Sequence, residues 1–249
     1  MADYKQVLNS IEIHSVNGIR QYFENGGGPN DVLPDSKSLF TMMVEMYTRT
    51  PRFRECIKLF IDYGLEYEDK ALLAVLTDDD AKLGKIIAED ASIILKTYTD
   101  FKNTYTPLTG GTLLHFCAEY NCCACAEVLL KNGADINSKA AFDQFGFGGH
   151  TPIFHTVNQN MNNSAGMLLF LLENGADLTV NVKGLLWGDG YDWETFIPAV
   201  NPLSYAMMGL LPQMHRNPET VAGVVSLLIK HAYGIDYGLP NVPNTYLAG

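Results

Sequence analysis

The sequence has few basic residues. Lys and Arg together number 17, against 28 Asp and Glu, which gives a formal net charge of −11. This deficit argues against nucleic acid and anionic membrane surfaces as partners, because both attract clustered positive charge. It favours a basic partner, although solubility alone also explains an acidic chain. The sequence has no apolar run of about 18 residues or more, so we expect no transmembrane helix.

Catalytic signatures are also missing. The sequence contains no phosphate-binding loop that follows a strand, no nucleophile elbow and no metalloprotease motif. The six His residues are spread along the chain and form no triad signature. We therefore expect no enzyme activity and no cofactor. His115 is expected to make a structural hydrogen bond at a helix start, and His150 and His155 are kept as the candidate pair for ligand contact.

Cysteine is scarce, with five residues, four of which cluster at 117, 122, 123 and 125. A zinc site is the obvious alternative, but no second Cys pair follows at zinc-finger spacing, and the helical phase separates these side chains. We favour core packing, because free Cys behaves as a small hydrophobe. The odd count and the polar start at Met1 indicate a reducing, cytoplasmic setting.

Two phrases recur along the chain. Asn132-Gly133-Ala134-Asp135 returns as Asn174-Gly175-Ala176-Asp177, each time after an amphipathic stretch. Asn-Gly after an apolar helix is typical of a left-handed C-terminal cap. Upstream of each stands a helix start, Thr112-Leu113-Leu114-His115 or Thr151-Pro152-Ile153, because Thr caps amides and Pro suits the first helical position. The two short helices between these phrases cannot bury their own apolar stripe, so neighbouring units must stack.

These phrases resemble the ankyrin repeat: they match its Thr-Pro-Leu-His opening and its helix–hairpin junction. The resemblance implies an all-α fold, an ankyrin-type solenoid of about six helix-turn-helix repeats with elongated hairpin or loop insertions on one edge. In the unit at about 70–93, Asp90 stands where the other units have Gly and is expected to adopt the left-handed cap conformation. The single domain covers 1–249, with units at about 3–30, 38–67, 70–93, 111–137, 149–179 and 201–236, insertions at 94–110, 138–148 and 180–200, and a tail at 237–249.

The insertions are rich in aromatic residues. Three Phe lie among Gly in 140–149, and both Trp residues of the chain lie in 184–197. These two loops leave consecutive units from the same edge, about 10 Å apart, so we expect them to form one continuous surface. The rings then serve either as a binding surface or as a local core of the loops. The turn at 48–52 faces the opposite edge and is interpreted as a spacer.

The resemblance and the lack of catalytic motifs favour a non-catalytic protein–protein interaction module in the cytoplasm. We expect a monomer that binds one protein partner, with no nucleic acid, membrane or metal. The alternative function is a pocket between the insertions at 138–148 and 180–200 that binds a small molecule or a modified residue, or that serves a minor hydrolase activity. The candidate protein-binding residues are Phe142, Phe145, Phe147, His150, Trp187, Asp189, Tyr191, Asp192 and Trp193.

Overall fold

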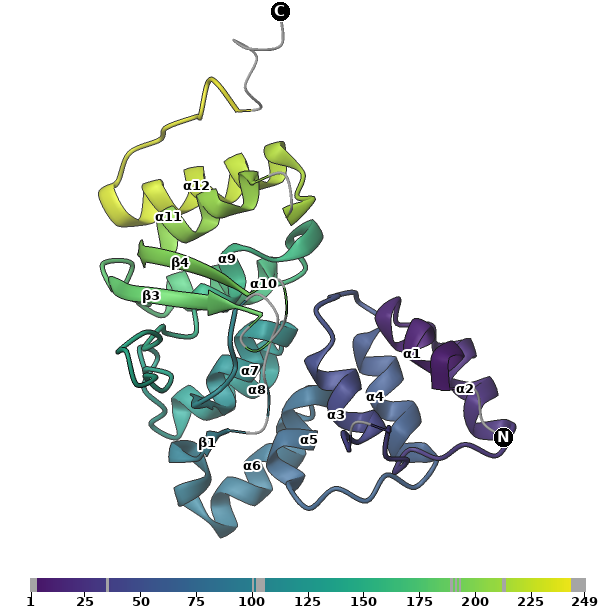
Figure 1. Ribbon diagram of the computed structural model, residues 1–249. Helices are drawn as coiled ribbons and strands as arrows, with labels where there is room; N and C mark the ends of the chain where they lie inside the picture. The colour runs from purple at the N-terminus through teal and green to yellow at the C-terminus, as the bar shows by residue number, and fades with distance from the viewer. Residues whose placement is uncertain are drawn as a thin grey trace, which may run out of the picture.

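The computed structural model describes residues 4–34, 36–99, 101, 106–188, 190, 192, 194–211 and 214–242. Within these residues the chain forms consecutive helix pairs (Figure 1). The pairs are α1 (Tyr4–Glu12) with α2 (Val16–Glu24), α3 (Leu39–Glu45) with α4 (Phe53–Asp62), α5 (Lys70–Thr77) with α6 (Asp80–Glu89), α7 (Leu113–Tyr120) with α8 (Cys123–Lys131), α9 (Phe154–Val157) with α10 (Ala165–Glu173), and α11 (Pro202–Met207) with α12 (Pro218–Tyr233).

Helix α12 shows how local sequence sets these elements. The Asn217 side chain caps its first turn by accepting from the Thr220 N–H at 2.9 Å, and Pro218 occupies the first turn. Apolar residues at helical spacing then form one buried stripe, which confirms the periodicity argument. That stripe consists of Val221, Val224, Val225 and Leu228.

Left-handed glycines end the helices where the sequence predicts them. Gly133 has a φ of +93° and Gly175 a φ of +85°. After α8, the N–H of Gly133 donates to the Leu130 carbonyl and that of Ala134 to the Leu129 carbonyl, each at 3.0 Å. This pair of hydrogen bonds satisfies carbonyls that the helix end would otherwise leave free. The predicted caps are therefore confirmed at both positions.

The prediction for Asp90 is wrong. Its φ is −144°, so its backbone is extended and not left-handed. Its carboxylate instead accepts from the Ser92 N–H at 2.9 Å and starts a short 3₁₀ helix, η1 (Ala91–Leu95). An Asp side chain can cap the next turn, and this option outweighs the left-handed conformation here.

The helical expectation is confirmed, but the description as all-α needs a correction. Strands β1 (Thr97–Tyr98) and β2 (Gly111–Thr112) form one antiparallel pair. Strands β3 (Val182–Trp187) and β4 (Thr195–Val200) form a longer hairpin, in which Leu185 lies opposite Ile197. Both pairs involve the predicted insertions, where extended backbone satisfies its own polar groups by pairing. Two further 3₁₀ helices, η2 (Asn160–Asn162) and η3 (Met208–Leu210), complete the described elements.

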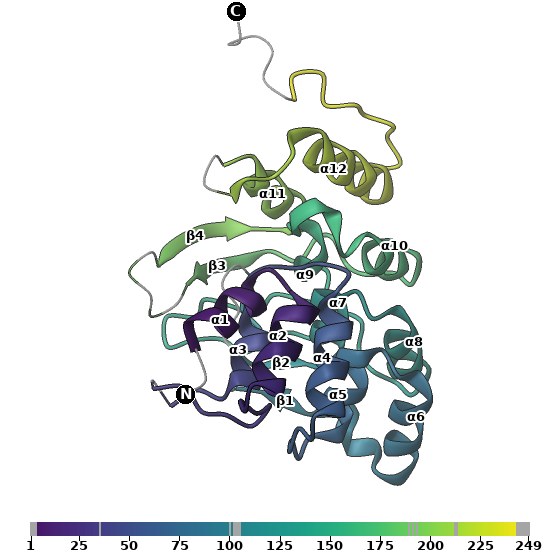
Figure 2. The same cartoon turned by 90° about the vertical axis from the view of Figure 1, so that its right-hand side faces the viewer.

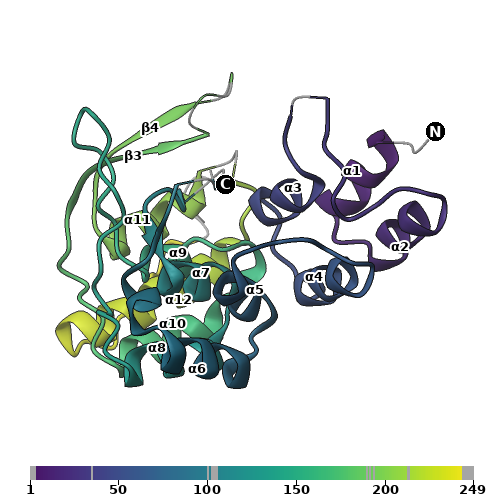
Figure 3. The ribbon, with the colours of Figure 1, turned by 90° about the horizontal axis from the view of Figure 1, so that it is seen from below.

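The later helix pairs stack in order. Figure 2 shows α6, α8, α10 and α12 one above another along one side, with the β3–β4 hairpin projecting on the other. Helices α1–α4 lie beside this stack and form a separate group in the view of Figure 3. Helix α4 packs against α5 at the junction of the two groups. The molecule therefore bends between the second and third helix pairs.

One apolar core runs through both groups. Its largest fully buried rings include Phe40 and Phe60 in the first group and Phe116, Phe154 and Tyr205 in the second. Three of the clustered Cys residues, Cys117, Cys122 and Cys125, belong to it, which confirms their core position, whereas Cys123 is only partly buried. Burial raises the pKa of the Cys122 thiol to about 12.

Candidate protein-binding face

The loop at 140–149 and the β3–β4 hairpin form one surface, as the sequence predicts. The Gly148 N–H donates to the Gly184 carbonyl at 2.9 Å, and Lys183 Nζ donates to the Phe145 carbonyl at 2.8 Å. The rings of Phe147 and Phe196 lie 4.7 Å apart between centroids. Backbone and side-chain contacts therefore join the two insertions, which come from consecutive helix pairs.

The turn inside the loop depends on Asp143. Its Oδ1 accepts from the N–H groups of Phe145 and Phe147, at 2.8 and 2.9 Å. Gly148 has a φ of +99°, and a Cβ at that position would lie 2.3 Å from the Ala141 carbonyl oxygen. Only glycine fits this close approach without distortion. The aromatic rings of the loop are therefore presented by an ordered turn.

Several of the predicted aromatic residues reach solvent. Phe142 is 59% exposed and Phe145 is 60% exposed, whereas Phe147 is half-buried between Phe145 and Phe196. Phe196 is itself 46% exposed, although it is not among the candidate residues from sequence. We call Phe142, Phe145, Phe147 and Phe196 the aromatic face. Phe145, Phe147 and Phe196 are in ring contact, and Phe142 lines one pocket together with Phe147. Large exposed aromatic surface of this kind is typical of binding sites.

Two other candidates lie in the interior. The Trp187 side chain is buried, and its Nε1–H donates to the Tyr205 hydroxyl at 2.9 Å. That hydroxyl also shares a hydrogen bond with Thr106, again at 2.9 Å. His150 is buried too, and its Nε2 lies 2.7 Å from the Pro107 carbonyl. Both side chains support the hairpin and loop from behind and do not face solvent.

The remaining candidates fall in the sequence between β3 and β4. Asp192 is exposed. Asp189, Tyr191 and Trp193 lie outside the described residues. Glu194, also exposed, accepts from the Gly190 N–H at 2.9 Å and so closes part of the tip.

A small pocket opens beside the aromatic face, between the two insertions. Its volume is about 140 Å³. The sequence-based alternative of a small-molecule site needs a cavity of about 300–1,000 Å³. This pocket is therefore too small for a drug-sized ligand. It is lined by Pro107, Thr109, Ala141, Phe142, Asp143, Phe147, Gly148, His150, Leu185 and Leu186.

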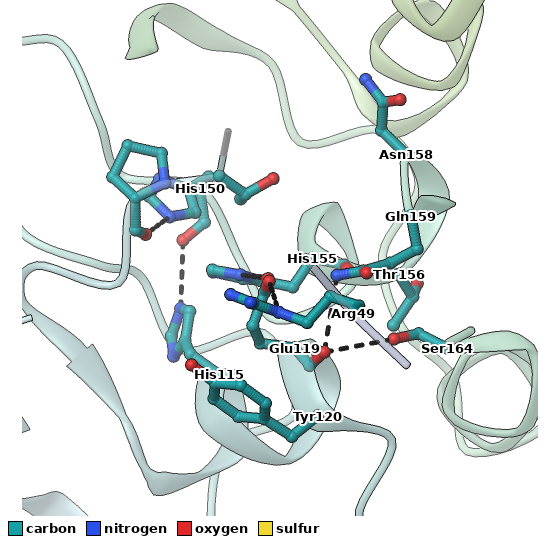
Figure 4. Close-up of polar contacts among 12 residues, drawn as sticks. Arg49, His115, Glu119, Tyr120, His150, His155, Thr156, Asn158, Gln159 and Ser164 are labelled. Atoms are coloured by element: carbon teal, nitrogen blue, oxygen red, sulfur yellow. Dashed lines mark hydrogen bonds and ion pairs between the residues drawn. The ribbon is translucent and has the colours of Figure 1, made fainter. Parts of the chain in front are cut away.

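Behind this face lies a buried polar network that the sequence did not reveal (Figure 4). Glu119 on α7 accepts from Arg49 Nε through Oε1, at 2.7 Å, and pairs with His155 Nδ1 through Oε2, also at 2.7 Å. The side chains of Arg49 and Glu119 are only 5% and 4% exposed. Burial on its own raises the pKa of Glu119, but the charge of Arg49 and the hydrogen bond from His155 outweigh it and lower this pKa to about 2.

Arg49 comes from the turn between α3 and α4, so the network joins the two groups of helices. Asn163 Nδ2 donates to the Arg49 carbonyl at 2.6 Å, and the rings of Phe53 and Tyr120 stack at 4.4 Å. The turn at 48–52 is therefore more than the spacer that the sequence suggests. Arg49 and Glu119 are 70 positions apart, and no local pattern marks such a pair.

Three buried His residues lie together here: His155, which belongs to the network, and His115 and His150, whose rings lie beside that of His155. His115 accepts from the Thr112 N–H at 3.0 Å, which confirms its structural role at the start of α7. His150 and His155 lie 5.2 Å apart between ring centroids. Burial, followed by the nearby His155, lowers the pKa of His150 to about 3. Among the described residues, no group of three His, Cys, Asp or Glu has the arrangement of a metal site.

Comparison with known families identifies one segment. The ankyrin repeat model matches residues 109–141, which contain β2, α7 and α8. The chain therefore carries an ankyrin repeat, and the resemblance drawn from the sequence is confirmed. No curated protein matches the chain. Within the part of the chain that the structure describes, every helix is too short or too polar to cross a membrane.

Proposed function

We propose that this chain is a non-catalytic protein-binding module. In this proposal its helix pairs are about six ankyrin-type repeats in one solenoid, and the aromatic face is its main contact surface. Ankyrin repeats are generally protein–protein interaction modules, so the repeat at 109–141 supports this class. The observation that carries the proposal is the solvent exposure of Phe142 and Phe145 on an ordered turn.

An ordered aromatic surface is well suited to binding. Large rings contribute strongly to interface energy, and they lose little conformational entropy when a partner covers them because they have few rotatable bonds. The turn that Asp143 fixes lowers the ordering cost further, since the loop is already held in shape. Acidic residues at the hairpin tip, including Asp192 and Glu194, favour a basic partner. We extend the proposed surface to Asp189, Tyr191 and Trp193, and we propose a monomer that acts in the cytoplasm.

The test is an affinity capture from native lysate with the wild-type chain and a Phe142→Ser/Phe145→Ser variant, read by quantitative mass spectrometry. A matched control is Leu95→Ser, because Leu95 is 79% exposed and lies outside the aromatic face. We expect the variant to weaken recovery of one specific partner, with a loss of affinity of about 30-fold or more for the purified pair. The control should recover it normally. Equal recovery by all three proteins would refute the role of this face.

A further inference from the structure

The pocket beside the aromatic face is mostly apolar. Leu185 and His150 are buried, while Ala141, Phe142 and Asp143 are exposed. Phe142 and Phe147 belong to both the pocket and the aromatic face, so the two are continuous. A partner that covers the face therefore also covers the pocket.

The size of the pocket limits what can enter it. A cavity of about 150 Å³ with apolar walls accommodates one benzene-sized group. This pocket, at about 140 Å³, matches that size. It therefore suits a single Leu- or Phe-sized side chain. Burial of such a group in a preformed pocket is typical of the anchor residues that dominate interfaces.

The titratable and charged groups near the pocket are His150, Asp143 and Lys183. The Lys183 amine lies 5.4 Å from the Phe147 ring centroid and donates to the Phe145 carbonyl, so it occupies the Phe147 side of the pocket. His150 is neutral at neutral pH because burial lowers its pKa to about 3. Asp143 is exposed and uses Oδ1 for the Phe145 and Phe147 N–H groups. Those two hydrogen bonds fix the carboxylate in place while Oδ2 keeps its capacity to accept. A cation next to the anchor can pair with Asp143 and lie over the exposed ring of Phe142.

Resting on the proposed protein-binding function, we propose that this pocket is an anchor site for a partner segment in which a Leu- or Phe-sized residue is followed directly by Lys or Arg. The apolar side chain fills the space between Phe142, Phe147, Leu185 and Leu186. The cation pairs with Asp143. The net charge of −11 favours approach of such a basic segment.

Three capped dipeptides serve as probes: N-acetyl-phenylalanyl-arginine amide, its glutamine analogue, and N-acetyl-glycyl-arginine amide. Binding to the full chain is measured by NMR titration of backbone amide shifts. We expect the shifts to cluster at residues 141–150 and 185–186. The Phe-Arg probe should bind about threefold more tightly than Phe-Gln, the size of an exposed charge pair. The Gly-Arg probe should bind at least about tenfold more weakly than Phe-Arg.

Two variants and a control assign these effects to the pocket. Asp143→Asn keeps an oxygen acceptor for the turn and should abolish the preference for Arg over Gln. Ala141→Phe should fill the pocket and weaken the Phe-Arg probe at least about tenfold. The control is Asp135→Asn, which removes one exposed charge from an Asx-type turn in the preceding hairpin. It should leave the preference unchanged.

The outcomes separate this proposal from the general binding function. Amide shifts elsewhere, no preference for the apolar probe, or an Arg preference that survives Asp143→Asn would overturn the anchor site. In those cases, a partner that is captured by the wild-type chain and lost in the Phe142→Ser/Phe145→Ser variant would still support the aromatic face. If no partner is captured, the dipeptide titrations alone still decide whether the pocket binds its proposed ligand.

Discussion

The ion pair between Arg49 and Glu119 makes the sharpest stability prediction. We consider three variants: Glu119→Gln, Arg49→Met, and the double variant Arg49→Met/Glu119→Gln. Glu119→Gln leaves Arg49 buried without its counter-charge, and Arg49→Met leaves the buried Glu119 carboxylate paired with His155 but without the Arg49 charge. The double variant removes both charges and leaves the shape of the site largely intact.

The expected magnitude follows from burial. Both side chains are almost fully buried, at 5% and 4% exposure, and Glu119 also pairs with His155 at 2.7 Å. Removal of one partner from a buried pair costs about 3–5 kcal/mol, because the remaining charge stays desolvated. We therefore expect each single variant to lower the free energy of unfolding by that amount. The double variant should lose less than the sum, with a coupling of about 1–3 kcal/mol.

The assay is urea unfolding monitored by circular dichroism, combined into a double-mutant cycle. Glu127→Gln is the matched control, because Glu127 pairs with Lys131 at 2.6 Å while both side chains are largely exposed, at 57% and 69%. That surface pair should contribute less than about 1 kcal/mol. Losses below about 1 kcal/mol for both buried single variants, or strictly additive losses, would refute the reasoning.

The same network should control how the two groups of helices are held together. Arg49 belongs to the turn between α3 and α4, whereas Glu119 belongs to α7. Loss of the pair removes a contact that crosses the bend. We expect native-state amide exchange in α1–α4 to rise more than exchange in α11 and α12 when Glu119→Gln is introduced. A uniform rise across all helices would show that the pair supports the fold without locating the bend.

Acid should destabilise the fold, because burial lowers the pKa of His14 and of His150 to about 3. The unfolded chain binds these protons below about pH 6.5, so the stabilising effect of the two neutral His side chains is complete above that pH and is lost as the pH falls towards 3. His14 and His150 together should change the free energy of unfolding by about 3 kcal/mol between about pH 7.5 and 5.5. Equal urea midpoints at the two pH values would contradict this. Gly133→Val and Gly175→Val should each cost about 1 kcal/mol or more, from backbone strain alone, since a Cβ added at either position would have no atom within 4 Å; unchanged melting temperatures would refute the cap assignment. Trp187→Ala should cost about 3–5 kcal/mol, because the indole is 3% exposed; a wild-type melting temperature would place it outside the core.

Local features of the fold could be predicted from the sequence with good accuracy. The left-handed caps at Gly133 and Gly175 and the buried stripe of α12 are present in the structure. These features depend on residues within a few positions of one another, so short-range physics determines them. The failure at Asp90 is also instructive. Two local options competed there, and the sequence alone did not rank the side-chain cap above the left-handed backbone.

The candidate site was predictable only in part. Its aromatic composition and the contact between the two insertions followed from the sequence, because both loops leave neighbouring units from the same edge. The direction of each ring did not follow. Phe142 points to solvent, whereas Trp187 packs inward and donates to Tyr205. Similar aromatic residues in adjacent loops thus have opposite roles, and the choice depends on which partner for the indole N–H lies within reach.

The sequence by itself determined that this chain is a stack of short helix pairs with an ankyrin repeat at its centre. It could do so because caps, turns and apolar spacing act within single units and recur along the chain. Tertiary structure alone decided where the stack bends and which polar groups become buried there. Arg49 meets Glu119 and His155 only after three separate helix pairs are in place. The energy of such a contact depends on desolvation and geometry at that junction, and neither is encoded in any local stretch of the chain.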